Sequence, residues 1–320
     1  MTESGPLQMR QNLPDRLNRR ECEDFLATIK ENVCSVFPFR SAQEQKDFTV
    51  ALDHVLANEE SFASADAFTN KVRGALASLK NSHTQLRAAV GAMADPRGFQ
   101  EPMPDALIEV RMFENNVAYL KIDAWASVQN ATGKDVGDLA EEALLASIGA
   151  RAIIIDVREN GGGDSSVAEK VARHFVKSKT PFARILVRKD TNSLELESDE
   201  AYIEPKEPYI DTPLLLLTSP KCLSSNEMFI LMLKDAHPEK TTIIGETTGG
   251  GSGNPTEFPI MLRGKKYELW VSTWSLVRMN GQELEGVGIQ PDIPAELHTE
   301  GVSGGTDRVL QKALEYVSGN

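Results

Sequence analysis

One segment that could carry chemistry passes from a strand-like run into a helix-like run: LLLLTSPKCLSSNEMFILMLKDA, residues 214–236. A serine at a sharp strand-to-helix turn is exposed and has backbone N–H donors beside it, which suits a nucleophile. Ser224 and Ser225 both stand at this turn. The alternative is a helix cap, in which Glu227 completes a capping box from Ser224. Taken alone, the segment favours the cap, and it is not a G-x-S-x-G motif.

A second segment, IIIDVRENGGGDSS (residues 153–166), leads from a strand-like run through three glycines into a helix. Backbone N–H groups at such a helix start can hold an anion, either a phosphate or a transient oxyanion. The phosphate alternative is weak, because there is no G-x-G-x-x-G and no Lys-Ser/Thr after the glycines. A tight turn without a ligand explains the segment about equally well.

Two further residues could act as a base and as its partner. His83, in SLKNSHTQL, is the only one of the five histidines that stands beside a hydroxyl residue immediately after a helix-like run. It is therefore the first candidate for a general base. Glu285, in NGQELEGVGIQPDIPAE, could orient a base by hydrogen bonding, or could equally be a surface carboxylate. No Cys/His cluster has zinc spacing, and nothing marks a carboxylate-only metal site.

The elements that must position these residues fall into two parts. The first hundred residues are helical in pattern, with Phe25, Ile29 and Val33 spaced on one helix face. A stretch rich in proline and glycine, GAMADPRGFQEPMPD, then reads as a linker. Beyond it, short β-branched runs alternate with amphipathic helical stretches, which predicts an α/β fold with a largely buried sheet. We expect a helical N-terminal domain over residues 1–103 and an α/β core over 104–320.

The composition excludes several classes of function. The 320 residues hold 34 Lys and Arg against 47 Asp and Glu, a net charge of −13, which disfavours nucleic acid as a partner. No run of eighteen apolar residues predicts a membrane span, and the N-terminus has no apolar run typical of a secretory signal. Three cysteines (Cys22, Cys34 and Cys222) leave at least one unpaired, which argues against a disulfide scaffold. We expect a cytoplasmic enzyme.

Together, and in this order, the segments resemble those of a known peptidase family. IIIDVRENGGG, LLLLTSPKCLSSNEMF, TTIIGETTGGG, GQELEGVGIQPDI and a final D-x-x-L-x-x-A-L are similar to the tail-specific (carboxyl-terminal processing) and tricorn-core serine peptidases, from about Leu107 onward. The resemblance implies an α/β fold with a crotonase/ClpP-like ββα core, here preceded by a small helical domain. It also implies a serine hydrolase, most simply a peptidase that works through an acyl-enzyme.

The resemblance distinguishes two catalytic arrangements. In the tail-specific branch the base is a lysine, and its place in this sequence is taken by Gly251, with no lysine between Lys240 and Lys265. In the tricorn-like branch a Ser-His pair precedes the core and a glutamate follows it. The positions that match this branch are Ser224 as nucleophile, with Ser82, His83 and Glu285. Asn226 stands where the family commonly has Ser, Ala or Gly, so Ser225 and Ser219 remain rivals of Ser224.

The resemblance implies acyl transfer without a metal or an organic cofactor. Ser224 would attack a carbonyl, His83 would take its proton, and Ser82 and Glu285 would orient the imidazole. Backbone N–H groups of Gly161 or Gly162 and of Ser225 would form the oxyanion hole. The spacing between His83 and the first core strand leaves no room there for the PDZ domain that the tail-specific enzymes usually carry. The role of Cys222 stays open.

Three alternatives remain on the same fold. One is a binding module for a lipophilic ligand, as in the repeats of the interphotoreceptor retinoid-binding protein, and the full set of four candidate residues argues against it. Another is an esterase or amidase acting on a small natural product, which would use the same residues. The third is a crotonase-like acyl-CoA enzyme, which has no need of a Ser-His pair. We expect a peptide or small acyl substrate, no nucleic-acid or membrane partner, and a homo-oligomer as an open option.

Overall fold

The central sheet forms where the sequence predicts short β-branched runs. The computed structural model describes residues 16–89, 104–191, 193–296 and 307–319. The sheet has the strand order β12-β8-β7-β4-β3-β2, in which β2 is antiparallel to β3 and the other neighbours are parallel. Its strands are β2 (Ile108–Phe113), β3 (Val117–Ile122), β4 (Ala152–Asp156), β7 (Leu214–Thr218), β8 (Thr241–Gly245) and β12 (Ile293–Pro294).

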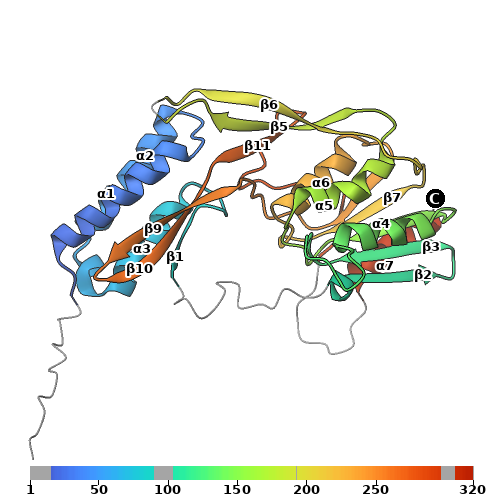
Figure 1. Ribbon diagram of the computed structural model, residues 1–320, viewed down its shortest axis with the longest axis horizontal. Helices are drawn as coiled ribbons and strands as arrows, with labels where there is room; N and C mark the ends of the chain where they lie inside the picture. Colours follow the sequence, from blue (N-terminus) through green and yellow to red (C-terminus); the bar gives the residue numbers. More distant parts are fainter. Residues whose placement is uncertain (1–15, 90–103, 192, 297–306, 320) are drawn as a thin grey trace, which may run out of the picture.

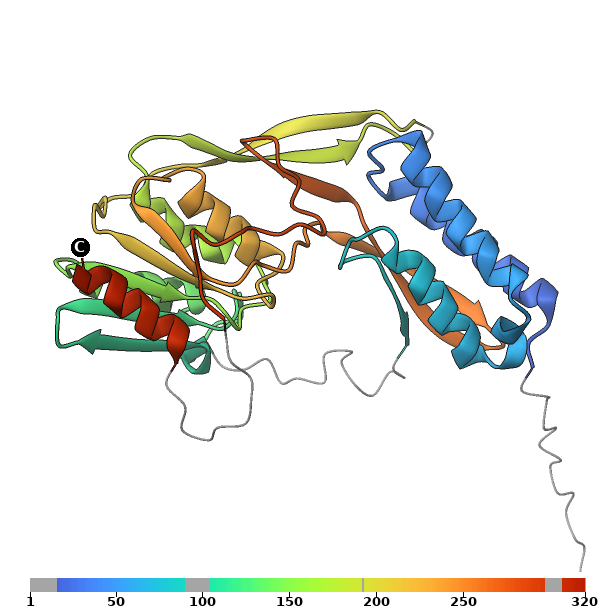
Figure 2. The same ribbon diagram turned by 180° about the vertical axis from the view of Figure 1, so that it is seen from behind.

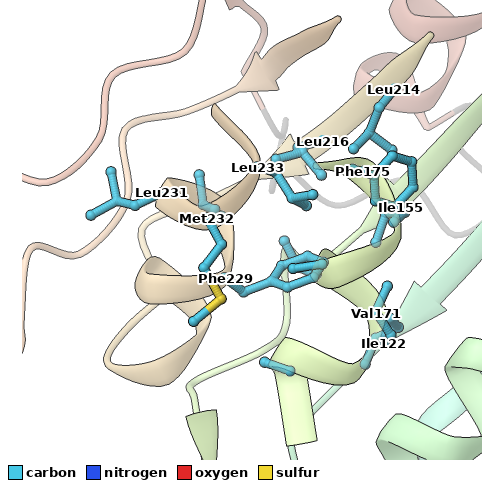
Figure 3. Close-up of a cluster of buried hydrophobic side chains, with 14 of the residues drawn as sticks. Ile122, Ile155, Val171, Phe175, Leu214, Leu216, Phe229, Leu231, Met232 and Leu233 are labelled. Atoms are coloured by element: carbon cyan, nitrogen blue, oxygen red, sulfur yellow. The ribbon is translucent and has the colours of Figure 1, made fainter. Parts of the chain in front are cut away.

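Helices cover both faces of this sheet, as its continuous apolar strands require. One face carries α4 (Val136–Ala146), α5 (Ser165–Ala172) and α6 (Ser225–Lys234), and the other carries α7 (Arg308–Gly319) (Figures 1 and 2). The short helices η2 (Pro104–Leu107) and η3 (Arg173–Phe175) lie in the connections. Figure 3 shows the buried cluster under α5 and α6, where Phe229 packs among side chains from β4, β7 and η3. We call this sheet with its helices the core lobe.

The second lobe is helical, as the sequence predicts, but strands complete it. Its helices are α1 (Arg19–Val36), α2 (Ala42–Ala57), η1 (Glu59–Ala63) and α3 (Ala65–Ala77), and the predicted positions Phe25, Ile29 and Val33 are buried. They pack on a sheet of order β1-β10-β9, which joins β1 (Gln85–Ala88) to β9 (Pro255–Leu262) and β10 (Lys265–Ser272). The helical lobe therefore includes a hairpin from late in the chain. The linker and the boundary expected near residue 103 lie outside the described residues.

A three-stranded arm connects the lobes. It consists of β5 (Thr180–Arg188), β6 (Leu196–Ile203) and β11 (Trp274–Arg278), in the order β11-β5-β6 (Figure 1). Phe182 packs in the core-lobe cluster, whereas Leu194 at the far end packs against the helical lobe. Across the described part of the chain, no helix combines the length and the apolar character needed to cross a bilayer.

Candidate active site

Ser224 stands at a strained turn between β7 and α6. Its backbone adopts φ 58° and ψ −129°, a region that residues other than glycine rarely occupy. Such strain costs about 1–3 kcal/mol and persists only where the surroundings enforce it, typically at functional sites. Here the Ser224 N–H donates to the Gly251 carbonyl at 2.8 Å, and the Ser224 carbonyl accepts from the first turn of α6. At this turn Ser224 stays half-buried, whereas the next three residues are buried in α6.

The Ser224 side chain does not cap α6. It accepts no hydrogen bond from the helix, and the Glu227 carboxylate bonds to the segment after β8 instead of closing a capping box. The two rival serines have other tasks, because Ser225 Oγ donates to the Gly163 carbonyl and Ser219 Oγ donates to the Arg158 carbonyl. Of these three serines, Ser224 is the one whose hydroxyl has no hydrogen-bond partner among the described residues. The cap interpretation of this segment is thus wrong.

The glycine turn after β4 packs directly against Ser224. Gly162 has φ +110°, and a Cβ built on it would lie 2.9 Å from Ser224 Cβ, so only glycine fits there. The N–H of Gly162 donates to Asn160 Oδ1 at 2.9 Å and is therefore occupied. The N–H groups of Gly161 and Ser225 have no partner within the described residues. Of the two glycines considered for an oxyanion hole, the geometry favours Gly161.

Asn226 and Cys222 lie behind the turn and are structural. The Asn226 side chain is fully buried, donates to the carbonyls of Val157 and Asn160, and accepts from Trp125 Nε1. It therefore ties α6 to the loop that carries the glycines. Cys222 is also fully buried, and burial raises the pKa of its thiol to about 12, so it stays protonated at neutral pH.

His83 lies on the helical lobe, in the short turn between α3 and β1. Its backbone N–H donates to Asn81 Oδ1 at 3.0 Å, and its Nδ1 lies 3.3 Å from Ser82 Oγ. The ring is half-buried, and burial together with the positive charge of Arg87 lowers the pKa of His83 below its usual 6.5. The imidazole is therefore neutral at neutral pH, the state in which it can accept a proton. No hydrogen bond within the described residues joins it to Ser224 Oγ.

Gly251 is the point at which the two halves of the site meet. Its carbonyl accepts the Ser224 N–H, and a Cβ built on it would lie 2.0 Å from Ser82 Oγ. The Ser82 hydroxyl therefore lies directly over the Gly251 α-carbon. This contact brings the Ser82–His83 pair to the segment that holds the backbone of Ser224.

Glu285 lies on the far side of the same segment. Its carboxylate accepts a hydrogen bond from Ser252 Oγ and longer ones from the Leu276 N–H at 3.3 and 3.4 Å, and Arg40 Nη2 is 3.8 Å away. Burial raises the pKa of Glu285 above its usual value, against the effect of these partners. Within the described residues it makes no direct bond to Ser82 or His83. It also borders a cavity of about 570 Å³ beneath the start of α2.

Comparison with known proteins identifies the family. Residues 116–295, more than half of the chain, match the sequence model of peptidase family S41. The chain belongs to peptidase family S41. No curated protein matches it. The match spans β3 to β12 and includes Gly161, Ser224 and Glu285, whereas Ser82 and His83 precede it.

Solved structures share this S41 fold at low sequence identity. A protein from Parabacteroides merdae ATCC 43184 described as a peptidase has a TM-score of 0.68 at 18% identity, covering 93% of this chain and 96% of that one. Mature CPAF in complex with lactacystin gives 0.66 at 10% identity, covering 94% and 97%. A lipoprotein from Streptococcus agalactiae gives 0.56 at 15% identity, covering 98% and 99%. The predicted fold class, a mixed α/β S41 fold with a helical N-terminal region, is confirmed.

Glu227 is buried and holds the segment that follows β8 in this S41 chain. The sequence suggested only a role for Glu227 in a capping box with Ser224. Its carboxylate accepts from Thr248 Oγ1, from the Gly250 N–H at 2.9 Å and from the Gly251 N–H at 2.8 Å. Burial raises the pKa of Glu227 to about 7 despite these three donors. Glu227 thereby fixes the position of Gly251, and through it the backbone of Ser224.

Sequence reasoning missed Asn81 and Ser252, which the structure places among the candidate residues of the S41 site. Asn81 precedes the Ser82–His83 pair and holds the His83 backbone, and Ser252 contacts Glu285. Each is the immediate neighbour of a residue that the sequence did single out, Ser82 and Gly251. That adjacency is the one signal that could have found them. No group of three His, Cys, Asp or Glu residues within the described ranges is arranged to hold a metal ion.

Proposed function

We propose that this S41 chain is a serine peptidase of the Ser-His type, with Ser224 as nucleophile and His83 as general base. The observation that carries the proposal is the geometry of Ser224. It combines a positive φ with a hydroxyl and two neighbouring N–H groups, those of Gly161 and Ser225, that have no hydrogen-bond partner among the described residues. A helix cap or a packing serine needs none of these, whereas acyl transfer needs an accessible hydroxyl and N–H donors for the oxyanion, and the strained turn supplies both at one place.

The chemistry follows from these atoms. Ser224 Oγ attacks the carbonyl carbon of the substrate, and its proton passes to the neutral imidazole of His83. The N–H groups of Gly161 and Ser225 bind the oxyanion that forms, and one such donor typically contributes about 3 kcal/mol of transition-state stabilisation. His83 then protonates the leaving amine, and water hydrolyses the acyl-enzyme by the same steps in reverse order. Catalytic hydrogen bonds are often long before substrate binds, so Ser224 and His83 need not touch in this structure.

The contact at Gly251 supports the Ser-His type over a Ser-Lys type. Gly251 occupies the position where the tail-specific enzymes carry their lysine base. A side chain there would collide with Ser82, since even a Cβ would lie 2.0 Å from Ser82 Oγ. The space that a lysine would need is therefore filled by the residue beside the histidine. Ser82, bonded to His83 Nδ1, and Glu285 would orient the ring.

We further propose that the substrate is a peptide held by the two lobes, without a PDZ domain between them. The segment 89–103, which joins β1 to η2, is too short for a domain of that kind. A small acyl substrate would use the same residues, and a digest of a peptide library against a panel of simple esters separates the two. Cytoplasmic location stays a prediction.

Labelling with a fluorophosphonate probe tests the nucleophile. Wild type is expected to be labelled, Ser224→Ala to lose labelling entirely, and His83→Ala to be labelled at least about a hundredfold more slowly. Ser219→Ala is the matched control, because Ser219 lies on the same turn with its hydroxyl bound to the Arg158 carbonyl, and it should keep labelling. Full labelling of Ser224→Ala, or an unlabelled wild type that is folded, overturns the proposal.

A further inference from the structure

Glu285 is held by a residue outside the four candidates. Its closest hydrogen-bond donor is Ser252 Oγ, and the remaining donor among the described residues is the Leu276 N–H. Ser82, which the family resemblance implies would orient the imidazole together with Glu285, contacts only His83 of the two, with its Oγ 3.3 Å from His83 Nδ1. The side-chain hydroxyl that holds the Glu285 carboxylate is therefore that of Ser252.

Ser252 is fully buried and forms hydrogen bonds through both its hydroxyl and its carbonyl. Its hydroxyl donates to Glu285, and its carbonyl accepts from Asn81 Nδ2 at 3.3 Å. Asn81 in turn accepts the His83 backbone N–H through Oδ1 at 3.0 Å. A continuous path of hydrogen bonds thus runs from the Glu285 carboxylate, through Ser252 and Asn81, to the backbone of the histidine.

The residue before Ser252 extends the path to the nucleophile. The Gly251 carbonyl accepts the Ser224 N–H, and its α-carbon lies against Ser82 Oγ. A displacement of Ser252 would therefore be transmitted to Ser224, Ser82 and His83 together.

We propose that Ser252 is a positioning residue for the catalytic machinery, whose hydroxyl holds the Glu285 carboxylate and whose backbone ties that carboxylate to Asn81 and His83. The proposal rests on the proposed function, because Ser252 acts through Glu285 and His83 and touches no substrate. A buried carboxylate without its main donor must find another partner or move, since an unsatisfied buried charge is costly. Loss of the hydroxyl would therefore release Glu285 from the position in which it supports His83.

The test is a double-mutant cycle on steady-state kinetics with a peptide substrate. Ser252→Ala is expected to lower kcat by about ten- to a hundredfold, with KM changed less than about threefold, because a hydrogen bond to a charged group is lost without a change at the substrate. In a Glu285→Gln background the same substitution should cost less than about threefold, since its target has already been changed.

Ser275→Ala is the matched control. Ser275 is also a buried serine and lines the same cavity as Glu285, but its hydroxyl has no partner in the described part of the chain. Its kcat should stay within about twofold of wild type. Thermal melting of each variant identifies the temperature at which all are folded.

The outcomes separate this inference from the proposed function. If Ser224→Ala abolishes labelling and His83→Ala slows it about a hundredfold while Ser252→Ala keeps wild-type kcat, Ser252 has no positioning role and the peptidase assignment stands. Equal losses from Ser252→Ala in the wild-type and Glu285→Gln backgrounds would also overturn the inference, because Ser252 would then not act through Glu285. A folded wild type without labelling would reject the proposed function itself.

Discussion

The two halves of the candidate site are built in different ways. Ser224 follows β7, in which all five residues are buried, and opens α6, which packs under the same sheet. His83 lies on a half-buried turn of the other lobe, next to an exposed Ser82. The proposed nucleophile is thus positioned by local backbone geometry inside one layered core, whereas the proposed base depends on contacts between distant segments. The difference teaches that the contacts between the two lobes, which we call the joint, decide whether His83 can reach the Ser224 hydroxyl.

That joint is formed by a few polar contacts. Asn81 Nδ2 donates to the Ser252 carbonyl at 3.3 Å, and Ser252 Oγ donates to the Glu285 carboxylate. Gly251 touches Ser82 on one side and the Ser224 backbone on the other. Short polar contacts of this kind each contribute about 1 kcal/mol to stability, so they can be altered without unfolding either lobe.

The largest effect is expected from Gly251→Ala, which separates the lobes at this joint. The new Cβ would lie 2.0 Å from Ser82 Oγ and 3.2 Å from Ser82 Cβ, so the Ser82 side chain must turn away and give up its contact with His83 Nδ1, while the strained turn at Ser224 stays. We expect kcat/KM for a peptide substrate to fall at least about a hundredfold, because a shift of about 1 Å in a catalytic group has effects of that size. Circular dichroism should show an unchanged fold.

Gly74→Ala provides the control for this prediction. Gly74 lies within α3 of the same lobe, and a Cβ there would meet no atom within 4 Å. Alanine should keep full activity and stabilise the helix by up to about 1 kcal/mol. Wild-type kcat/KM in Gly251→Ala would show that the joint does not set the geometry of the base.

The same contrast explains what the sequence could predict. Ser224 is predictable because its signals are adjacent: an apolar strand, a small-residue turn and an apolar helix. The helices of the N-terminal lobe follow from the spacing of Phe25, Ile29 and Val33. Local patterns of this kind carry information about a fold and about one half of a site.

The remaining features depend on contacts that no local pattern encodes. β9 and β10 read as further strands of the α/β part, but they pair with β1 and pack on the helical lobe. Ser252 and Asn81 are ordinary small polar residues until the fold places them together. The occupied N–H of Gly162 could not be predicted either, because it depends on the side chain of Asn160 in a folded turn.

A smaller effect is expected in the core lobe, where Glu227→Gln should change how the free energy of unfolding depends on pH. In the folded protein the pKa of Glu227 is raised to about 7, so the folded chain holds a proton that the unfolded chain releases near pH 4.5. The free energy of unfolding should therefore fall as pH rises between these values, by about 1–3 kcal/mol in wild type, and glutamine removes this contribution. Urea unfolding at pH 5 and pH 8 measures it.

Glu257→Gln is the control, since it removes an exposed carboxylate on β9. It should keep the wild-type dependence on pH. If Glu227→Gln lost the same free energy of unfolding as wild type between pH 5 and pH 8, the Glu227 carboxyl would not be the group that titrates there. The segment around Gly251 would then need another explanation for its fixed position.

The smallest effect is expected on the helical lobe from Arg87→Gln. Burial and the Arg87 charge lower the pKa of His83, which extends the neutral, proton-accepting form of the ring to more acidic pH. Without Arg87 the pKa of His83 moves back toward 6.5, so a larger fraction is protonated and inactive at pH 6. We expect kcat/KM to drop about twofold at pH 6 and to stay unchanged at pH 8, because exposed charges act weakly through solvent.

The pH profile of kcat/KM, compared with that of Arg111→Gln, isolates this effect. Arg111 is an exposed arginine on β2 of the core lobe, so the substitution changes net charge equally but far from the histidine. An acid limb that moves in Arg87→Gln alone assigns the limb to His83. If the acid limb moves in neither arginine variant but disappears in Glu227→Gln, the group that titrates is Glu227 of the core lobe. His83 of the helical lobe would then not be the group that limits activity at acidic pH.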